Sequence, residues 1–214
     1  MTALDDDATA TGQAPAAGRR RRMSPAERRQ QLLDAGVRMA RELPPEDVTM
    51  EAVAENVGVS RGLVFHYFES TQDFQLAILR EQAAEMLERT RPPEGIADPN
   101  EAALAAIGAY VDYVEENPAA YSSVLRGGLS TDPALREVTE ATRGAVAQRV
   151  LSFAPTMGLE VTPVVRAATM GWIALTEDVM TRWIEEPTLT RDEILGLLTT
   201  SLLAVAGAAA LVDA

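Results

Sequence analysis

Apolar residues recur every three or four positions along most of this 214-residue chain, the spacing that places them on one side of an α-helix. The first such stretch has a single apolar face formed by Leu32, Leu33, Val37 and Ala40. Its start is marked by Ser24-Pro25-Ala26-Glu27, which combines a capping serine, a proline in the first turn and a glutamate three residues after the cap. No segment alternates apolar and polar residues as a half-buried strand does. The pattern predicts an all-α protein.

Prolines and helix caps divide the chain into segments. Pro44-Pro45 ends the first helix near Arg41, and a longer helix begins at the cap Ser70-Thr71-Gln72-Asp73 and ends before Pro92-Pro93. Two short helices are expected between them. Five more helices are expected after Pro92-Pro93, the last one starting with a second capping box. The predicted ranges are 24–41, 50–56, 61–67, 70–90, 100–117, 119–127, 132–153, 162–186 and 191–211.

These breaks predict three units. Residues 1–23 lack helical periodicity over most of their length and are expected to form a disordered tail that contains arginines. Residues 24–91 are expected to form a small helical domain with its connecting helix. Residues 95–214 are expected to form a larger helical domain.

The composition excludes several kinds of chemistry. The chain has no cysteine and a single histidine, His66, so disulfides, thiolate nucleophiles, Cys-based metal sites and His-rich metal sites are ruled out. The remaining enzyme alternative is a carboxylate-based one in the C-terminal domain, using Glu115-Glu116, Glu177-Asp178 or Glu185-Glu186. Adjacent residues on a helix do not face one another, so these pairs favour solvated helix faces. We expect no enzyme activity, no cofactor and no metal.

The N-terminus and the apolar runs indicate a location. No uninterrupted apolar run reaches 18 residues, and the first residues are polar and acidic. Neither a membrane span nor a secretory signal is therefore expected, which favours a cytoplasmic protein.

Charge is distributed unevenly along the chain. The formal net charge is −13, yet residues 19–70 carry nine arginines against eight acidic residues, whereas 71–214 carry ten against 21. All 19 basic residues are arginine, a side chain that makes paired hydrogen bonds to phosphate and guanine. Four of them stand together as Arg19, Arg20, Arg21 and Arg22. This run is either an arm that enters a DNA minor groove or a solvated charge cluster.

The stretch from Thr49 to Phe68 has the spacing of a helix-turn-helix. Gly58 can take the left-handed conformation of the turn, Ala54 is small where the helices approach, and Ser60 is expected to cap the second helix. Five apolar residues occupy core positions: Val53, Val57, Val59, Val64 and Tyr67. A plain helical hairpin is the structural alternative.

The exposed face of the second helix is suited to a DNA major groove. Arg61 can bind guanine, Gly62 allows close approach, and Leu63 can contact a thymine methyl group. His66 lies on the same face, where a phosphate or base contact is favoured over a buried structural role and catalysis is not expected. The candidate phosphate contacts are Thr49, Tyr67, Ser70 and Thr71, and Ser60 completes the predicted DNA-binding set.

The sequence here resembles the TetR family of bacterial transcriptional regulators, over about Gln31 to Leu79. The resemblance is carried by Val48-Thr49-Met50-Glu51-Ala52-Val53-Ala54, Gly58-Val59-Ser60 and Phe65-His66-Tyr67-Phe68-Glu69-Ser70. This chain has Thr71 where the family often has a phosphate-binding lysine, and Phe65 where it often has tyrosine. The resemblance implies a homodimer in which the last two long helices pack into a four-helix bundle.

The C-terminal domain offers candidates for self-association and for a ligand pocket. The predicted dimer residues, which are equally suited to a monomer core, are Val179, Trp183, Ile184, Ile194, Leu198 and Leu202. Aromatic and methionine side chains suit an apolar pocket with a few hydrogen-bonding groups. The predicted pocket residues are Tyr110, Tyr113, Tyr121, Phe153, Met157, Met170 and Trp172.

These expectations combine into one hypothesis with two alternatives. We expect a sequence-specific regulator of double-stranded operator DNA, a repressor that a small, largely apolar effector releases by displacing the helix from Asn100 against the helix from Ser70. The two binding events would then oppose each other. The alternatives are a ligand-independent regulator controlled by a partner protein, and the carboxylate-based enzyme.

Overall fold

The computed structural model describes residues 23–43, 47–96, 98–126 and 132–212, and within them all regular structure is helical. The all-α prediction is therefore confirmed, and the predicted helix ends agree within one or two residues. The Arg19–Arg22 run lies outside the described residues. The helices are α1 (Pro25–Glu42), α2 (Met50–Val57), α3 (Arg61–Tyr67), α4 (Thr71–Arg89), α5 (Pro99–Glu116), α6 (Pro118–Arg126), α7 (Pro133–Ser152), α8 (Pro163–Glu185) and α9 (Arg191–Val212), with an unpredicted 3₁₀ turn, η2 (Ala154–Met157), after α7.

Local capping explains why the helices begin where they do. At α1, the Ser24 hydroxyl accepts the Glu27 N–H at 3.2 Å, and the Glu27 carboxylate accepts the Ser24 N–H at 2.7 Å. At α9, the Glu193 carboxylate accepts the Thr190 N–H at 2.8 Å. Both predicted capping boxes are confirmed, and each satisfies backbone donors that the first helical turn leaves unpaired.

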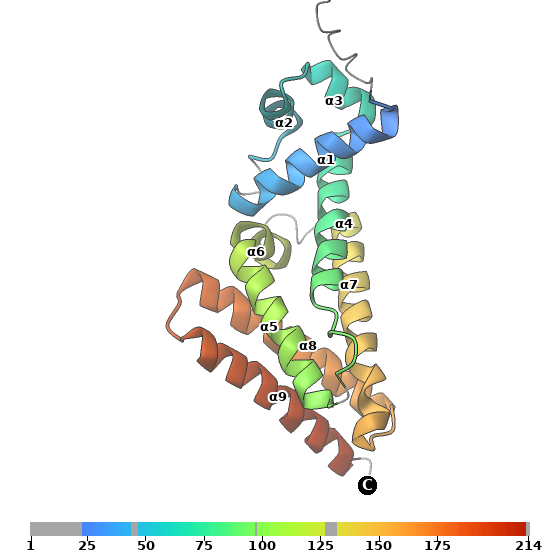
Figure 1. Cartoon of the computed structure of the whole chain (residues 1–214), viewed down its shortest axis with the longest axis vertical. Helices are drawn as coiled ribbons and strands as arrows, with labels where there is room; N and C mark the ends of the chain where they lie inside the picture. Colours follow the sequence, from blue (N-terminus) through green and yellow to red (C-terminus); the bar gives the residue numbers. More distant parts are fainter. Residues whose placement is uncertain (1–22, 44–46, 97, 127–131, 213–214) are drawn as a thin grey trace, which may run out of the picture.

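The molecule is elongated, with α1, α2 and α3 at one end and α8 and α9 toward the other (Figure 1). The helix α4 joins the two regions. It packs against α1 near the end that carries α2 and α3, and against α7 and α5 further along. The helix α4 therefore belongs to both regions.

The N-terminal region has its own core, in which α1 and α4 approach closely. Leu32, Val53, Val64, Phe68 and Phe74 are all fully buried there. The rings of Phe68 and Phe74 meet edge to face with centroids 4.7 Å apart. This core fixes the angle at which α2 and α3 leave the body of the protein.

A second core lies between α5, α8 and α9, and it contains several of the predicted dimer residues. Ile194 and Leu198 are 0% exposed, and Trp183 is buried with its indole N–H donating to the Leu189 carbonyl at 2.8 Å. The Trp172 indole N–H likewise donates to the Leu198 carbonyl at 3.1 Å. Trp183, Ile194 and Leu198 are thus buried in the core of the protomer, the alternative that the sequence left open for them. Val179, Ile184 and Leu202 are half-buried against the same core.

The outer face of α9 is apolar and uncovered. In the described part of the chain, α9 is the one helix long and apolar enough to cross a membrane by length and composition, with mean hydropathy 2.1 over its most apolar window and 17% of that window buried. It packs along α8 and α5 through one side only. Its exposed apolar residues are Leu197, Leu203, Leu211 and Val212.

Candidate nucleic-acid interface and effector cavity

The turn between α2 and α3 has the geometry that the sequence predicts. Gly58 has φ = 73° and ψ = 39°, the left-handed conformation that glycine adopts without strain. The Val59 N–H donates to the Ala54 carbonyl at 2.9 Å and so closes the end of α2. Ala54 and Val64 are buried where the two helices meet. The helix-turn-helix prediction is confirmed over these residues.

One face of α3 points away from the body at the far end of the molecule (Figure 1). Arg61, Gly62 and His66 are exposed, and Leu63 is half-buried. Tyr67 is also half-buried, because its ring packs against the N-terminal core and meets the His66 ring edge to face, with the ring centroids 5.1 Å apart. The predicted base-contacting side chains therefore share an accessible surface.

Ser60 occupies the N-cap position of α3 but does not cap it through its side chain. The hydroxyl makes no capping hydrogen bond, so the prediction that Ser60 caps α3 through its side chain is wrong. The backbone still turns the chain into α3, since the Leu63 N–H donates to the Ser60 carbonyl at 3.0 Å. The exposed Ser60 hydroxyl is consequently available to an external acceptor.

Arg61 is held by two neighbours that the sequence did not reveal as functional. Its Nη2 lies 2.6 Å from a carboxylate oxygen of Glu51, and both side chains are largely exposed. Its guanidinium carbon lies 5.0 Å from the ring centroid of Phe65, a cation–π contact. Phe65 itself is 40% exposed. The spacing of four residues between Arg61 and Phe65 on one helix is the sequence signal for this contact.

Three of the four predicted phosphate-contacting hydroxyls lie at two helix N-termini, and the fourth, that of Tyr67, is at the end of α3. The Thr49 hydroxyl accepts the Ala52 N–H at 3.1 Å at the start of α2, and the Ser70 hydroxyl accepts the Asp73 N–H at 3.0 Å at the start of α4. Each hydroxyl keeps its own proton to donate to a further acceptor. Thr71 is exposed on the first turn of α4. Hydroxyl donors at positive helix ends suit an anionic backbone.

A cavity of about 260 Å³ lies between α4, α5, α7, α8 and α9. This is slightly below the roughly 300–1,000 Å³ that is typical of small-molecule sites. Met170 is outside the cavity, because its side chain points away from the bundle on α8 and is 39% exposed. The other six predicted pocket residues all contribute to the lining: Tyr110, Tyr113, Tyr121, Phe153, Met157 and Trp172.

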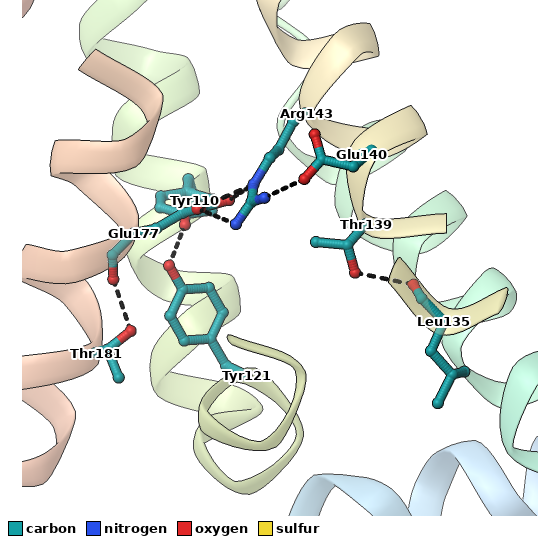
Figure 2. A network of polar contacts seen from close by, with 8 residues as sticks. All are labelled: Tyr110, Tyr121, Leu135, Thr139, Glu140, Arg143, Glu177 and Thr181. Carbon is teal, nitrogen blue, oxygen red and sulfur yellow. Dashed lines mark hydrogen bonds and ion pairs between the residues drawn. The ribbon is translucent and has the colours of Figure 1, made fainter. Parts of the chain in front are cut away.

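One part of the lining is a polar network, shown in Figure 2. The hydroxyls of Tyr110 and Tyr121 are 2.5 Å apart. Arg143 donates two hydrogen bonds to the Glu177 carboxylate, from Nε to Oε1 at 2.9 Å and from Nη2 to Oε2 at 2.7 Å, and a third to Glu140. Burial raises the pKa of Tyr110 above its usual range, and the Glu177 carboxylate raises the pKa of Arg143. The two tyrosines therefore stay neutral and the Arg143 guanidinium stays charged at neutral pH.

Other polar groups on the lining were not predicted. Gln82 Nε2, Asn117 Oδ1 and Thr176 Oγ1 are buried and have no hydrogen-bond partner among the described residues. An unpaired buried donor or acceptor costs about 1–3 kcal/mol. Groups on a bound molecule that pair with these atoms would recover part of that cost.

Comparisons with known proteins identify the family of this chain. With an α3 face suited to DNA and a helical domain around a cavity, the chain is a DNA-binding transcriptional regulator. The family described as "Bacterial regulatory proteins, tetR family" matches residues 32–78, and "Tetracyclin repressor-like, C-terminal domain" matches residues 99–205. The chain belongs to the TetR family of transcriptional regulators.

Individual relatives agree with this assignment. The HTH-type transcriptional activator FasR of Mycolicibacterium smegmatis is 27% identical over 177 residues, 79% of each chain. The HTH-type transcriptional repressor AcnR of Corynebacterium diphtheriae is 41% identical over 61 residues, which span 28% of this chain and 32% of AcnR. A TetR-family regulator from Streptomyces coelicolor superposes with TM-score 0.81 at 25% identity, covering 89% of this chain and 85% of that one. FadR of Bacillus subtilis in complex with stearoyl-CoA has the same fold (TM-score 0.62, 17% identity, 83% and 97% coverage).

Proposed function

We propose that this protein is a homodimeric repressor that binds operator DNA through α3 and is released by a small, largely apolar effector. The observation that carries the proposal is the double role of α4. The same helix contributes Leu79, Ala83 and Met86 to the cavity and packs against α1 in the DNA-reading region. The effector site and the DNA-binding surface therefore share one rigid element.

In the DNA complex, α3 lies in the major groove. Arg61 donates to a guanine, Leu63 contacts a thymine methyl group, and Gly62 lets the helix backbone approach the bases. Phosphates on either side are contacted by His66 and by the hydroxyl groups of Thr49, Ser60, Tyr67, Ser70 and Thr71. Since Thr71 is uncharged, the Arg19–Arg22 run supplies further backbone affinity from an adjacent minor groove.

Two copies associate through the exposed faces of α8 and α9. The exposed apolar groups there lie on the sides of these helices that face away from the protomer core, and they include Leu175, Leu197 and Leu203. A partner's α8 and α9 would cover them in a four-helix bundle. The same pairing explains why α9 is apolar all round, without requiring a lipid surface. A dimer places two recognition helices roughly 34–36 Å apart, one turn of DNA.

Effector binding changes the position of α4. An occupant of the cavity separates α4 from α5 and α7, which pack on its two sides. Two contacts pass the movement toward DNA: Arg41 of α1 is paired with Glu85 of α4 at 2.7 Å, and Gln72 of α4 donates to Asp132 at 2.5 Å. DNA and effector favour different distances between the two DNA-reading regions of the dimer, so each weakens the binding of the other.

Two observations bear on the nature of the effector and on the rival functions. Stearoyl-CoA is bound by the FadR neighbour, and a long apolar chain is the chemistry that an apolar cavity of this kind accepts. The carboxylate-based enzyme is disfavoured because Glu177 is the single acidic residue on the described lining, and Arg143 neutralises it. A regulator controlled only by a partner protein would not need such a cavity.

The proposal is tested by selecting genomic DNA fragments on the full-length protein and measuring operator affinity by fluorescence anisotropy. Apolar compounds of graded size are then titrated into the operator complex. We expect at least one to lower operator affinity tenfold or more while leaving binding to scrambled DNA unchanged. An operator affinity that no compound alters would contradict effector control and favour the partner-controlled regulator.

A further inference from the structure

We infer that the effector is a monoanionic amphiphile whose carboxylate binds Arg149 while its apolar chain fills the cavity. This assignment rests on the proposed function and adds the chemical class of the effector. It begins with the charges on the described part of the cavity lining, which are Arg143, Arg149 and Glu177. Since Arg143 and Glu177 neutralise each other, the lining keeps one uncompensated positive charge in a chain of net charge −13.

Arg149 is held by neutral oxygens alone. Its Nη1 donates to the Thr90 hydroxyl at 2.9 Å, and its Nη2 donates to the Leu87 carbonyl at 2.7 Å. No carboxylate of the described residues lies within ion-pair distance of it. A guanidinium has five N–H donors, so further donors remain for a bound anion. Arg143, six residues earlier on the same helix, shows the contrast, because two carboxylates surround it.

The surroundings of Arg149 disfavour a lone cation. Its side chain is partly buried, and burial together with the nearby charge of Arg91 lowers the pKa of its guanidinium. The Glu88 carboxylate opposes this shift only in part, because it is itself paired with Arg91 at 2.7 Å. The group nevertheless remains protonated at neutral pH, since arginine titrates far above it. A ligand carboxylate would supply the counter-charge through a bidentate pair of hydrogen bonds with the guanidinium.

The rest of the lining determines what the carboxylate is attached to. Near Arg149 the lining is formed by Val150, Phe153 and Ala154, and it continues over apolar side chains of α5, α8 and α9. An alkyl or fused-ring body would bury its surface there at about 25 cal/mol per Å². The combination selects an amphiphile over a small polar acid.

The same guanidinium connects the cavity to the helix that carries the DNA-reading region. Both of its acceptors are on the last turn of α4 or next to it, and the Thr90 hydroxyl in turn donates to the Met86 carbonyl at 2.8 Å. A carboxylate that binds the remaining donors of Arg149 draws the guanidinium toward the cavity and away from the Leu87 carbonyl and the Thr90 hydroxyl. The tie between α7 and the end of α4 is then weakened, which is the movement that releases DNA.

The test compares three probes of equal chain length: decanoate, 1-decanol and decylammonium. Binding is followed by the fluorescence of Trp172, which lines the cavity, and by calorimetry. We expect decanoate to bind roughly tenfold to hundredfold more tightly than 1-decanol, the ratio of a charge-assisted hydrogen bond, and decylammonium to bind most weakly.

Three variants separate charge recognition from general damage. Arg149→Gln should abolish the preference for decanoate and leave the affinity for 1-decanol unchanged, while Arg149→Lys should keep part of the preference. Arg80→Gln is the matched control, because Arg80 is exposed on α4 and does not line the cavity. Thermal melts of each variant check the fold.

The outcomes distinguish the two levels of the hypothesis. Equal binding of decanoate and 1-decanol, or a preference that survives in Arg149→Gln, overturns the carboxylate assignment; if either compound still lowers operator affinity, the proposed function stands. Binding of neither probe, with no effect on operator affinity, counts against the apolar effector and the carboxylate assignment together.

Discussion

Replacing Gly36 by alanine tests the close packing of α1 on α4 that links the DNA-reading region to the cavity. A Cβ at position 36 would lie 2.6 Å from the Cζ atom of Phe74 and 2.8 Å from the Cδ1 atom of Ile78. Phe74 is fully buried and packs edge to face against Phe68, so its ring cannot move away from the added methyl group. Adding a methyl group to such a site costs about 1–3 kcal/mol.

The helix itself gains from the same change. Alanine is favoured over glycine in a helix interior by about 1 kcal/mol. With the unyielding Phe74 ring placing the steric cost in the upper half of its range, Gly36→Ala should destabilise the protein by about 1–2 kcal/mol. The matched control is Gly144→Ala on α7, where a Cβ meets no atom within 4 Å and stability should rise by up to about 1 kcal/mol.

Urea unfolding followed by circular dichroism measures both variants, with operator affinity measured in parallel. Gly36→Ala should lower the unfolding midpoint and weaken operator binding, because α2 and α3 are oriented by this core. If Gly36→Ala were as stabilising as Gly144→Ala, the close contact between α1 and α4 would be refuted.

Three further predictions concern the DNA face, the dimer and the cavity. Phe65→Ala should weaken operator binding, measured by anisotropy, by about 0.5–1 kcal/mol, because the cation–π contact with Arg61 is lost. If Phe65→Ala caused the same loss in a protein that already carries Arg61→Ala, the coupling between the two side chains would be contradicted. Leu197→Glu should shift the dimer toward monomer in analytical ultracentrifugation, since Leu197 is 43% exposed on α9; an unchanged dimer would place the interface elsewhere. Burial raises the pKa of Tyr113 to about 12 and that of Tyr121 well above its usual value, so stability should fall as pH rises from about 10 toward 12, and tyrosines that ionise near pH 10 without unfolding would contradict this burial.

Local signals made most of the fold predictable from the sequence. The capping boxes at Ser24 and Thr190 fix helix starts through hydrogen bonds within four residues, and Gly58 fixes the turn through its own backbone conformation. The DNA-binding face followed from the same stretch, because α2 and α3 must bury Val53 and Val64 and thereby leave Arg61 outside.

The parts that the sequence left open depend on partners distant in sequence. α9 is apolar on every side, so its pattern does not say that Ile194 and Leu198 face the core while Leu197 and Leu203 face outward. The same ambiguity misplaced Met170. Arg149 gave no signal, since an arginine on a helix ordinarily lies on a solvated face.

The central claim, that α3 reads a specific operator, is tested most directly by the affinity of wild-type protein and Arg61→Ala for the selected operator and for single-base variants of it. The account predicts that the wild type binds the operator far more tightly than scrambled DNA, and that Arg61→Ala loses about 1–3 kcal/mol on the operator and becomes indifferent to one base pair. Equal affinity of the wild type for operator and scrambled DNA, or a variant that still discriminates at every position, would contradict it.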